Sequence, residues 1–363
     1  MPRDISGLDL SDAFYTQVVK PIIDQHDPDL HYAAARIGAG SEVLGFDDAM
    51  SRDHDWGPFI TIFLDEEEAH LADALQDTLR YALPHQFMGY STNFITAPED
   101  PSVSVMAITT HGTVNHRVTS TTVEAYVSAY LGWDSKTELT PADWLSFPSH
   151  KLRSVISGRV FHDGIGHLTH TRATLGWYPE DVWRYLLAAQ WRRLGEEDHL
   201  MMRACYRGDG IGATLIASRL VNDIMRLCFL MEEQYAPYPK WFGTAFAQLD
   251  IATDLTMPLR ALQLADGFDA RQSAYSTLVE IMRDKHNQLN LTRTVNPAAQ
   301  CFHSRPFYVS DGGTIATLLL QSIDTDHAIF SLPDMLGNID QVSDHTGLRS
   351  NAIWHEKIKQ LYH

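Results

Sequence analysis

The stretch of sequence that decides the fold is RIGAGSEVLGFDDAMSRDHDWGPFITIFL, which occupies residues 36–64. It begins inside a short apolar run, 31–40, that closes on glycines, and it ends in a β-branched and aromatic run, 57–64. Short apolar runs bounded by glycine are typical of buried strands. The sequence therefore predicts two strands joined by a polar loop.

Two aspartates, Asp53 and Asp55, lie at the predicted start of the second strand. Residues i and i+2 of a strand face the same side, so both carboxylates are expected to point the same way. Like charges placed together repel unless a cation lies between them. Carboxylate oxygens suit Mg²⁺, with Mn²⁺ as an alternative, and Mg²⁺ commonly takes one or two carboxylates together with substrate phosphates. The pair thus predicts a metal site.

Gly40 and Ser41 lie at the end of the first predicted strand. A glycine-rich turn at the N-terminus of a helix offers backbone N–H groups and the positive end of the helix dipole to a phosphate, and Ser41 adds a hydroxyl donor. The turn and the aspartates together are the parts needed to move a nucleoside monophosphate. The turn would hold a triphosphate, and the metal would join the carboxylates to its α-phosphate.

The order Gly40-Ser41 and then Asp53-His54-Asp55 resembles the signature of the DNA polymerase beta-like nucleotidyltransferase superfamily. That superfamily includes the aminoglycoside nucleotidyltransferases and the minimal nucleotidyltransferases of toxin–antitoxin pairs. The stretches GSEVLGFDDAMSRDHDWGP, YAPYPKWFGTAF and HSRPFYV are also similar to one bacterial branch of it that carries a domain of unknown function. The likeness to the branch covers nearly the whole chain, and the likeness to the superfamily covers mainly residues 30–130.

The resemblance implies an α/β (α+β) nucleotidyltransferase domain with a mixed sheet, followed by a mostly α-helical C-terminal domain. It implies that Gly40 and Ser41 contact the triphosphate and that Asp53 and Asp55 bind the metal and are catalytic. The implied enzyme is Mg²⁺-dependent and uses an NTP such as ATP as co-substrate. It transfers the nucleoside monophosphate to an acceptor hydroxyl and releases pyrophosphate. The resemblance does not identify the acceptor, and a small molecule or a protein is favoured over RNA.

A third carboxylate is usual in this superfamily, on a later strand, as metal ligand or general base. The strand expected near residues 114–126 has no acid at its alternating positions, Val118, Ser120 and Thr122. Glu124 is the nearest candidate for a catalytic base, and Asp163 is a more distant one.

Two departures from the superfamily pattern leave an alternative function open. Arg52 separates Ser51 from Asp53, where the superfamily usually has Ser-Asp directly. Trp56-Gly57-Pro58 follows the second aspartate, and Pro58 predicts a bulge or a sheet edge because it has no N–H to donate. With the third acid unplaced, the alternative is a catalytically inactive module that senses nucleotides or binds a protein.

Basic residues of the C-terminal half are candidates for further phosphate contacts. Arg203 and Arg207 are four residues apart and share a helix face, and Lys240 is a similar candidate. The other interpretation is ion pairing, because the chain has 46 acidic residues. The same two interpretations apply to Arg219, Arg226 and Arg305. The aromatic residues Tyr235, Tyr238 and Trp241 could stack on a base or sugar, or they could pack in the core.

The histidines and a glycine-rich segment have simpler interpretations. His54 is expected to be packed or hydrogen-bonded, and His162, His167 and His170 match neither HExxH nor a zinc-finger spacing. The segment RGDGIGATL, 207–215, follows a predicted helix and not a strand, which excludes a dinucleotide-binding fingerprint. We expect Asp209 to cap the next helix.

Composition places the chain among ordinary globular proteins of the cytoplasm. The 363 residues carry a formal net charge of −18, which disfavours a broad nucleic-acid footprint. Three scattered cysteines without a CxxC pair predict neither disulfides nor a zinc–thiolate site. No apolar leader and no uncharged apolar run of bilayer-spanning length is present, so we expect no membrane partner.

The pattern along the chain predicts three segments: an N-terminal helix, 1–27; a nucleotidyltransferase-like domain, 28–148; and a helical domain, 149–363. The boundary is placed in the turn-rich region 137–148. Apolar periodicity predicts helices at 8–26, 123–133, 179–206, 211–235, 257–266, 268–289 and 313–324.

Overall fold

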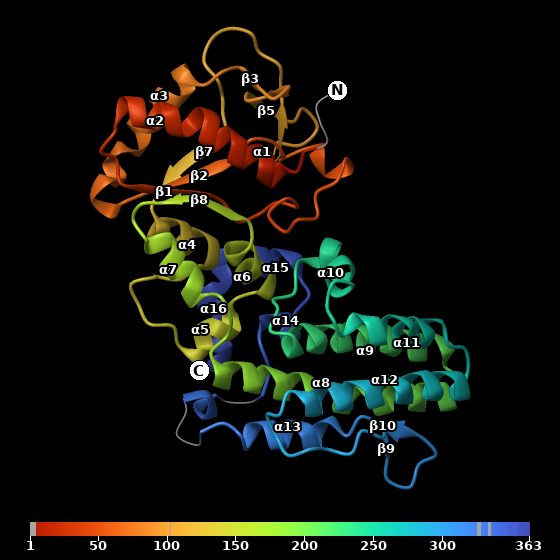
Figure 1. Ribbon diagram of the computed structural model, residues 1–363. Helices are drawn as coiled ribbons and strands as arrows, with labels where there is room; N and C mark the ends of the chain where they lie inside the picture. The colour runs from red at the N-terminus through yellow and green to blue at the C-terminus, as the bar shows by residue number, and fades with distance from the viewer. Residues whose placement is uncertain (1–4, 102, 325–327, 333–334) are drawn as a thin grey trace. The chain divides into compact units, whose positions relative to one another are not determined.

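The computed structural model describes residues 5–101, 103–324, 328–332 and 335–363 (Figure 1). The chain forms two compact units. The first comprises Met1–Glu138 and Lys151–Gly176, and the second comprises Leu139–His150 and Trp177–His363. The chain therefore leaves the first unit, returns to it and leaves it again, instead of passing once from one domain to the next.

The first unit is built on a four-stranded mixed sheet with the order β7-β2-β1-β8. β1 (Tyr32–Arg36) is antiparallel to both of its neighbours, β2 (Ile60–Leu64) and β8 (Arg159–Asp163). β7 (Val118–Thr121) pairs with β2 in parallel. This arrangement confirms the predicted mixed sheet and both strands predicted from the opening stretch.

The N-terminal helices cover the sheet and share its core. α1 (Gly7–Phe14) and α2 (Lys20–His26) are joined by a π-helical turn, Tyr15–Val19. Phe14 and Val19 pack with Ile60, Ile62 and Leu64, which are alternate residues of β2 and so face the same side. Residues 7–26 thus belong to the first unit and are not a separate segment.

The remaining elements of this unit lie around the sheet. A 3₁₀ helix, Glu66–Leu71, leads into α3, and the acidic residues of its first turn suit the positive end of a helix dipole. The sequence after β8 turns directly into α7, a strand–turn–helix. The bounds are α3 (Ala72–Ala82), β3 (Gln86–Phe87), β4 (Tyr90–Ser91), β5 (Phe94–Thr96), β6 (Ser104–Met106), α4 (Val123–Leu131), α6 (Ser149–Ile156, entering from the second unit) and α7 (His167–Thr174).

The second unit is mostly helical, as predicted (Figure 1). The predicted helices are present, although α9 ends earlier than expected and α11 begins earlier, with Pro258 inside it. Asp209 caps α9 by accepting a hydrogen bond from Gly212 N at 2.8 Å. The bounds are α5 (Pro141–Ser146), α8 (Glu180–Tyr206), α9 (Gly210–Met231), α10 (Pro239–Phe246), α11 (Ala252–Leu264), α12 (Phe268–Gln288), β9 (Gln300–Cys301), β10 (Tyr308–Val309), α13 (Gly312–Leu320), α14 (Ile339–Val342), α15 (Thr346–Ser350) and α16 (His355–Lys359).

Glycines let α8 and α13 approach each other closely. A Cβ added at Gly312 would overlap the carbonyl oxygen of Trp191. A Cβ added at Gly195 would lie 3.2 Å from Gly312 N. The neighbouring Gly313 has open space around it. The backbone contact between the two helices therefore depends on one glycine of the pair.

Over the residues that the structure describes, none of the helices is at once long enough and apolar enough to cross a bilayer.

Candidate functional site

The predicted phosphate turn and the two aspartates lie in one loop at one end of the sheet of the first unit. β1 ends at Arg36, β2 begins at Ile60, and the two strands are antiparallel neighbours with Ala35 opposite Thr61. The connecting loop, residues 37–59, must therefore close over a single end of the sheet. We refer to this segment as the β1–β2 loop.

The Gly40-Ser41 pair begins a turn and not a helix. Ser41 O accepts from Leu44 N at 3.2 Å and from Phe46 N at 2.9 Å, and Gly45 has a positive φ of 73°. A left-handed residue at that point prevents the turn from continuing as a helix. The prediction of a helix N-terminus here is wrong, so a phosphate would meet turn amides and the Ser41 hydroxyl without a helix dipole.

A buried ion pair fixes this turn. The Arg36 guanidinium donates to Glu42 Oε1 and, through its terminal nitrogens, to Ile37 O at 3.1 Å and Ala39 O at 2.6 Å. Glu42 is 2% exposed. Gly40 has a φ of 139°, and a Cβ there would clash with Arg36 and Glu42. Gly40 is thus required for the shape of the turn.

The loop is also tied to the N-terminal helix. Asp47 Oδ2 accepts from Trp56 Nε1 at 3.0 Å and from Gly7 N at 2.8 Å. Arg52 donates to Ile5 O at 2.9 Å and stacks over the Trp56 ring. α1 therefore serves as a scaffold for the candidate site.

Asp53 and Asp55 precede β2 and do not lie on it. Residues Met50–Arg52 form a 3₁₀ helix, the three following residues are bends, and β2 begins only at Ile60. The expected same-face placement on a strand is therefore wrong. Its physical cause lies just downstream: Gly57 has a φ of 148° and Pro58 cannot donate a ladder hydrogen bond.

The two carboxylates have different environments. Asp55 has a left-handed φ of 45°, and its backbone N and side-chain Oδ1 bond Ser104 O and Ser104 N at 2.8 and 3.1 Å. The Asp53 side chain is 62% exposed, and its Oδ1 lies 2.8 Å from His54 Nδ1. His54 is thus hydrogen-bonded, as expected. Both carboxylates reach solvent within the same loop, although they do not face each other across a strand.

Glu124 lies at the other end of the sheet. It belongs to the first turn of α4, directly after β7, and β7 runs parallel to β2. β2 has five residues, so at about 3.3 Å per residue its two ends are roughly 13 Å apart. Glu124 instead pairs with His167, with Oε1 2.7 Å from Nδ1. The structure therefore does not bring Glu124 together with Asp53 and Asp55, and its predicted role as their base is not supported by this placement.

Asp163, the other candidate, is also at that far end. It closes β8 opposite Ala33, and its carboxylate accepts from Gly166 N and Thr169 N, both at 2.8 Å. It therefore shapes the turn into α7. In the described part of the chain, no group of three acidic, histidine or cysteine side chains is placed to hold a metal ion.

Arg117 is a cation of this site that the sequence analysis missed. It directly precedes β7, and its carbonyl accepts from Ile60 N at 3.2 Å, which places it at the end of the sheet that carries the β1–β2 loop. Its guanidinium lies 6.0 Å from the Phe59 ring centroid and 5.9 Å from that of Phe94. Among the described residues it has no acidic partner. Only its position before a strand parallel to β2 could have indicated its place.

The predicted basic residues of the helical half belong to the second unit. Arg203 and Arg207 are exposed at the end of α8, and the amine of Lys240 lies 4.7 Å from the Trp241 ring centroid. Their phosphate contacts stay predictions. Arg219 forms an ion pair with Glu197 at 2.5 Å, which confirms the alternative interpretation for that residue.

Comparisons with known proteins give a limited likeness. Residues 144–242 match a family model described as a domain of unknown function, DUF4037. No curated protein matches the chain. The crystal structure of a nucleotidyltransferase-like protein from Exiguobacterium sibiricum 255-15 is similar over 94% of this chain and 91% of that chain, with 10% sequence identity and a TM-score of 0.35.

Proposed function

We propose that the first unit binds Mg²⁺ and a nucleoside triphosphate at the β1–β2 loop and transfers the nucleoside monophosphate to an acceptor hydroxyl. One observation carries the proposal: the antiparallel pairing of β1 with β2 puts Gly40-Ser41 and both aspartates in one loop over one end of the sheet. Arg117 adds a cation without an acidic partner, among the described residues, at the same end.

The residues present fit the proposed ligands. Asp53 and Asp55 are exposed carboxylates of the kind that bind Mg²⁺, and Mg²⁺ needs few protein ligands when it also binds phosphates. The bound metal would neutralise charge on the triphosphate. The Ser41 hydroxyl and the turn amides would donate to phosphate oxygens, and the Arg117 guanidinium would donate to others. The acceptor oxygen would lose its proton to solvent and bond to the α-phosphorus, and the bond to the leaving pyrophosphate would break.

Pyrophosphate release tests this proposal. We would incubate the protein with ATP, GTP, CTP or UTP and Mg²⁺, together with extracts that supply acceptors, and compare the wild type with Asp53→Asn and Asp55→Asn. Asp73→Asn, which changes an exposed aspartate on α3, is the matched control. We expect release in the wild type and the control and none in the loop variants. Equal release by all four proteins would refute the assignment.

A second candidate function is a nucleotide-sensing or protein-binding module without catalysis. Its support is the position of Glu124 at the opposite end of the sheet, which leaves the aspartate pair without that acid. This alternative expects nucleotide binding at the β1–β2 loop with no pyrophosphate release.

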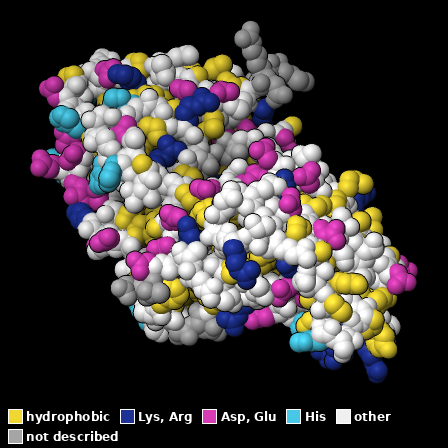
Figure 2. Space-filling view, turned by 60° about the horizontal axis from the view of Figure 1, so that its bottom comes forward, with side chains coloured by type: hydrophobic (Ala, Val, Ile, Leu, Met, Phe, Trp, Pro, Cys, Tyr) yellow, Lys and Arg dark blue, Asp and Glu magenta, His cyan; other side chains and the backbone are white. Residues whose placement is uncertain are grey.

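For the acceptor, a small molecule or a protein is favoured over RNA. The net charge of −18 disfavours binding to the negatively charged phosphate backbone of RNA. On the face that Figure 2 shows, Lys and Arg side chains are interspersed with acidic ones and do not gather into a broad basic patch. Retention of tRNA on a gel at low salt would contradict this preference.

A further inference from the structure

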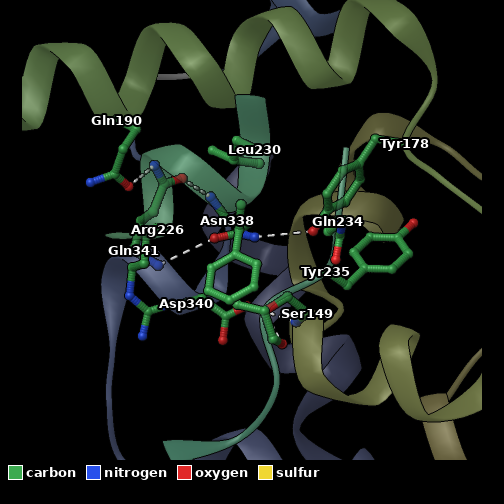
Figure 3. A pocket seen from close by; sticks show the side chains of 12 residues that line it. Ser149, Tyr178, Gln190, Arg226, Leu230, Gln234, Tyr235, Asn338, Asp340 and Gln341 are labelled. Atoms are coloured by element: carbon green, nitrogen blue, oxygen red, sulfur yellow. Dashed lines mark hydrogen bonds between the residues drawn. The ribbon is translucent and has the colours of Figure 1, made fainter. Parts of the chain in front are cut away.

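The second unit contains a small pocket of about 30 Å³ that is partly open to solvent and is lined by both apolar and polar side chains (Figure 3). Its inner space is small, on the scale of a water molecule or two. Polar side chains around it come from segments far apart in the sequence: Ser149, Gln190, Arg226, Gln234, Asn338 and Asp340. All of them belong to the second unit, whereas the β1–β2 loop belongs to the first.

Arg226 is the cation of this cavity. Its Nε donates to Asn222 Oδ1 at 2.9 Å, and its guanidinium lies 5.5 Å from the Phe242 ring centroid. These two contacts hold the side chain in place. Over the described residues, its two terminal nitrogens have no hydrogen-bond acceptor.

The acids nearest to Arg226 are already neutralised by other arginines. Asp340, which is 7% exposed, pairs with Arg349 at 2.5 Å and accepts from Ser149 N at 2.6 Å. Asp223 pairs with Arg193 at 3.0 Å. Burial lowers the pKa of Arg226, and the positive charges of Arg349 and Arg193 lower it further, against the opposing effect of the two acids. The surroundings therefore hold one cation in excess.

A second donor of the pocket also lacks an acceptor. Gln190 is fully buried, its Oε1 accepts from Gln341 Nε2 at 2.7 Å, and its own Nε2 has no acceptor among the described residues. Asn338 has its amide engaged with Tyr178 and Gln341. An unmet amide donor and an unpaired guanidinium in one cavity call for an acceptor that carries negative charge.

We infer that this cavity is an oxyanion-binding site that takes one carboxylate or phosphate group of a small ligand on the guanidinium fork of Arg226. Arginine binds both groups through two parallel hydrogen bonds, which a planar fork provides and a lysine does not. Because the pocket is partly open to solvent, such a group would bind the guanidinium from the solvent side. The remainder of the ligand would lie toward solvent, where Tyr235 also lines the pocket.

Thermal unfolding of the full chain tests the inference. Inorganic phosphate and acetate, each at constant ionic strength, are the two probes, since a ligand that binds only the folded state raises Tm. Arg226→Met removes the charge but keeps much of the side-chain length. Gln234→Glu places a carboxylate at an exposed rim position with little risk to the fold. Gln248→Glu, an exposed position elsewhere in the second unit, and Arg219→Gln, on α9, are the matched controls.

The inference expects phosphate, acetate or both to raise the Tm of the wild type and of the two controls, and to leave that of Arg226→Met and Gln234→Glu unchanged. A response to phosphate alone identifies a phosphate ligand, and a response to acetate identifies a carboxylate. No shift in the wild type with either probe would overturn the inference, as would equal shifts in all variants. The Asp53→Asn/Asp55→Asn variant should retain the shift, which separates this site from the proposed enzymatic one.

Discussion

Asp55 and Ser104 are joined by two hydrogen bonds: Asp55 N donates to Ser104 O at 2.8 Å, and Ser104 N donates to Asp55 Oδ1 at 3.1 Å. The position of this carboxylate is therefore set by the start of β6, almost fifty residues further along the chain. A residue that is proposed to bind metal also holds the β1–β2 loop in place.

Substitutions at Asp55 should separate these two roles. Asn keeps an acceptor for Ser104 N and tolerates a positive φ, so Asp55→Asn should unfold like the wild type. Asp55→Ala loses the hydrogen bond and strains the backbone, and should lower the free energy of unfolding by about 1–2 kcal/mol. Urea denaturation measures both. Equal loss of stability in the two variants would show that the charge itself is structural.

The ion pair between Arg36 and Glu42 should be critical for stability. Glu42→Gln leaves the guanidinium buried without its counter-charge, so we expect a loss of about 3–5 kcal/mol. Lys20→Met breaks the exposed pair with Asp24 and should change stability by less than about 1 kcal/mol. Urea denaturation of both variants compares them directly. If Glu42→Gln left the free energy of unfolding unchanged, the backbone carbonyls of the turn would suffice to hold Arg36.

Two adjacent glycines of α13 should respond in opposite ways to the same change. Gly312→Ala forces α13 away from Trp191 and should destabilise the protein by about 1–3 kcal/mol. Gly313→Ala has open space and should be neutral or stabilise the helix by up to about 1 kcal/mol. Thermal unfolding of the two variants compares their stability. A Gly312→Ala variant as stable as the wild type would mean that the fold does not require the close approach of α8 and α13.

The pH dependence of stability should contain a contribution from Asp198. Burial raises its pKa to about 6, although Ser310 N and the Tyr275 hydroxyl donate to it. The unfolded value is about 3.9, so the folded protein binds this proton more tightly. The resulting stabilisation is fully present below pH 4 and is lost as the pH rises through about 6. It amounts to up to about 3 kcal/mol.

Asp198→Asn keeps the acceptor and removes the titration. The difference in free energy of unfolding between the wild type and this variant should change between pH 4 and pH 7, with the wild type losing stability relative to Asn as the pH rises. Other carboxylates titrate in both proteins and cancel in the difference. A difference that is constant with pH would show that Asp198 titrates normally.

Arg117 should contribute to triphosphate affinity. Arg117→Met removes the guanidinium but retains packing against Phe59 and Phe94, and should weaken NTP binding by about tenfold, since a charge-assisted hydrogen bond contributes about 1.5 kcal/mol. Arg80→Met, which removes an exposed arginine of α3, is the control. Unchanged affinity would place the triphosphate elsewhere.

The strands and helices were predictable because their signals are local. The apolar runs around Gly40 gave both central strands, and helical periodicity gave the long helices of the second unit. The placement of Asp55 was not predictable, because it depends on Ser104, and no local pattern in the sequence connects those residues. The position of Glu124 depends on which end of β7 lies beside the start of β2, and that pairing is a property of the whole sheet. Arg226 was noted as a possible phosphate contact, but its cavity exists only once α14 packs against α8 and α9.

The central claim is that Gly40-Ser41 and the aspartates of the β1–β2 loop together bind a metal and a triphosphate. Titration calorimetry with each NTP, in Mg²⁺ and in EDTA, tests it most directly, on the wild type, on Asp53→Asn/Asp55→Asn and on the Asp73→Asn control. We predict binding of at least one NTP that requires Mg²⁺, persists in the control and disappears in the double variant. NTP binding that is unchanged in the double variant or in EDTA would contradict the claim.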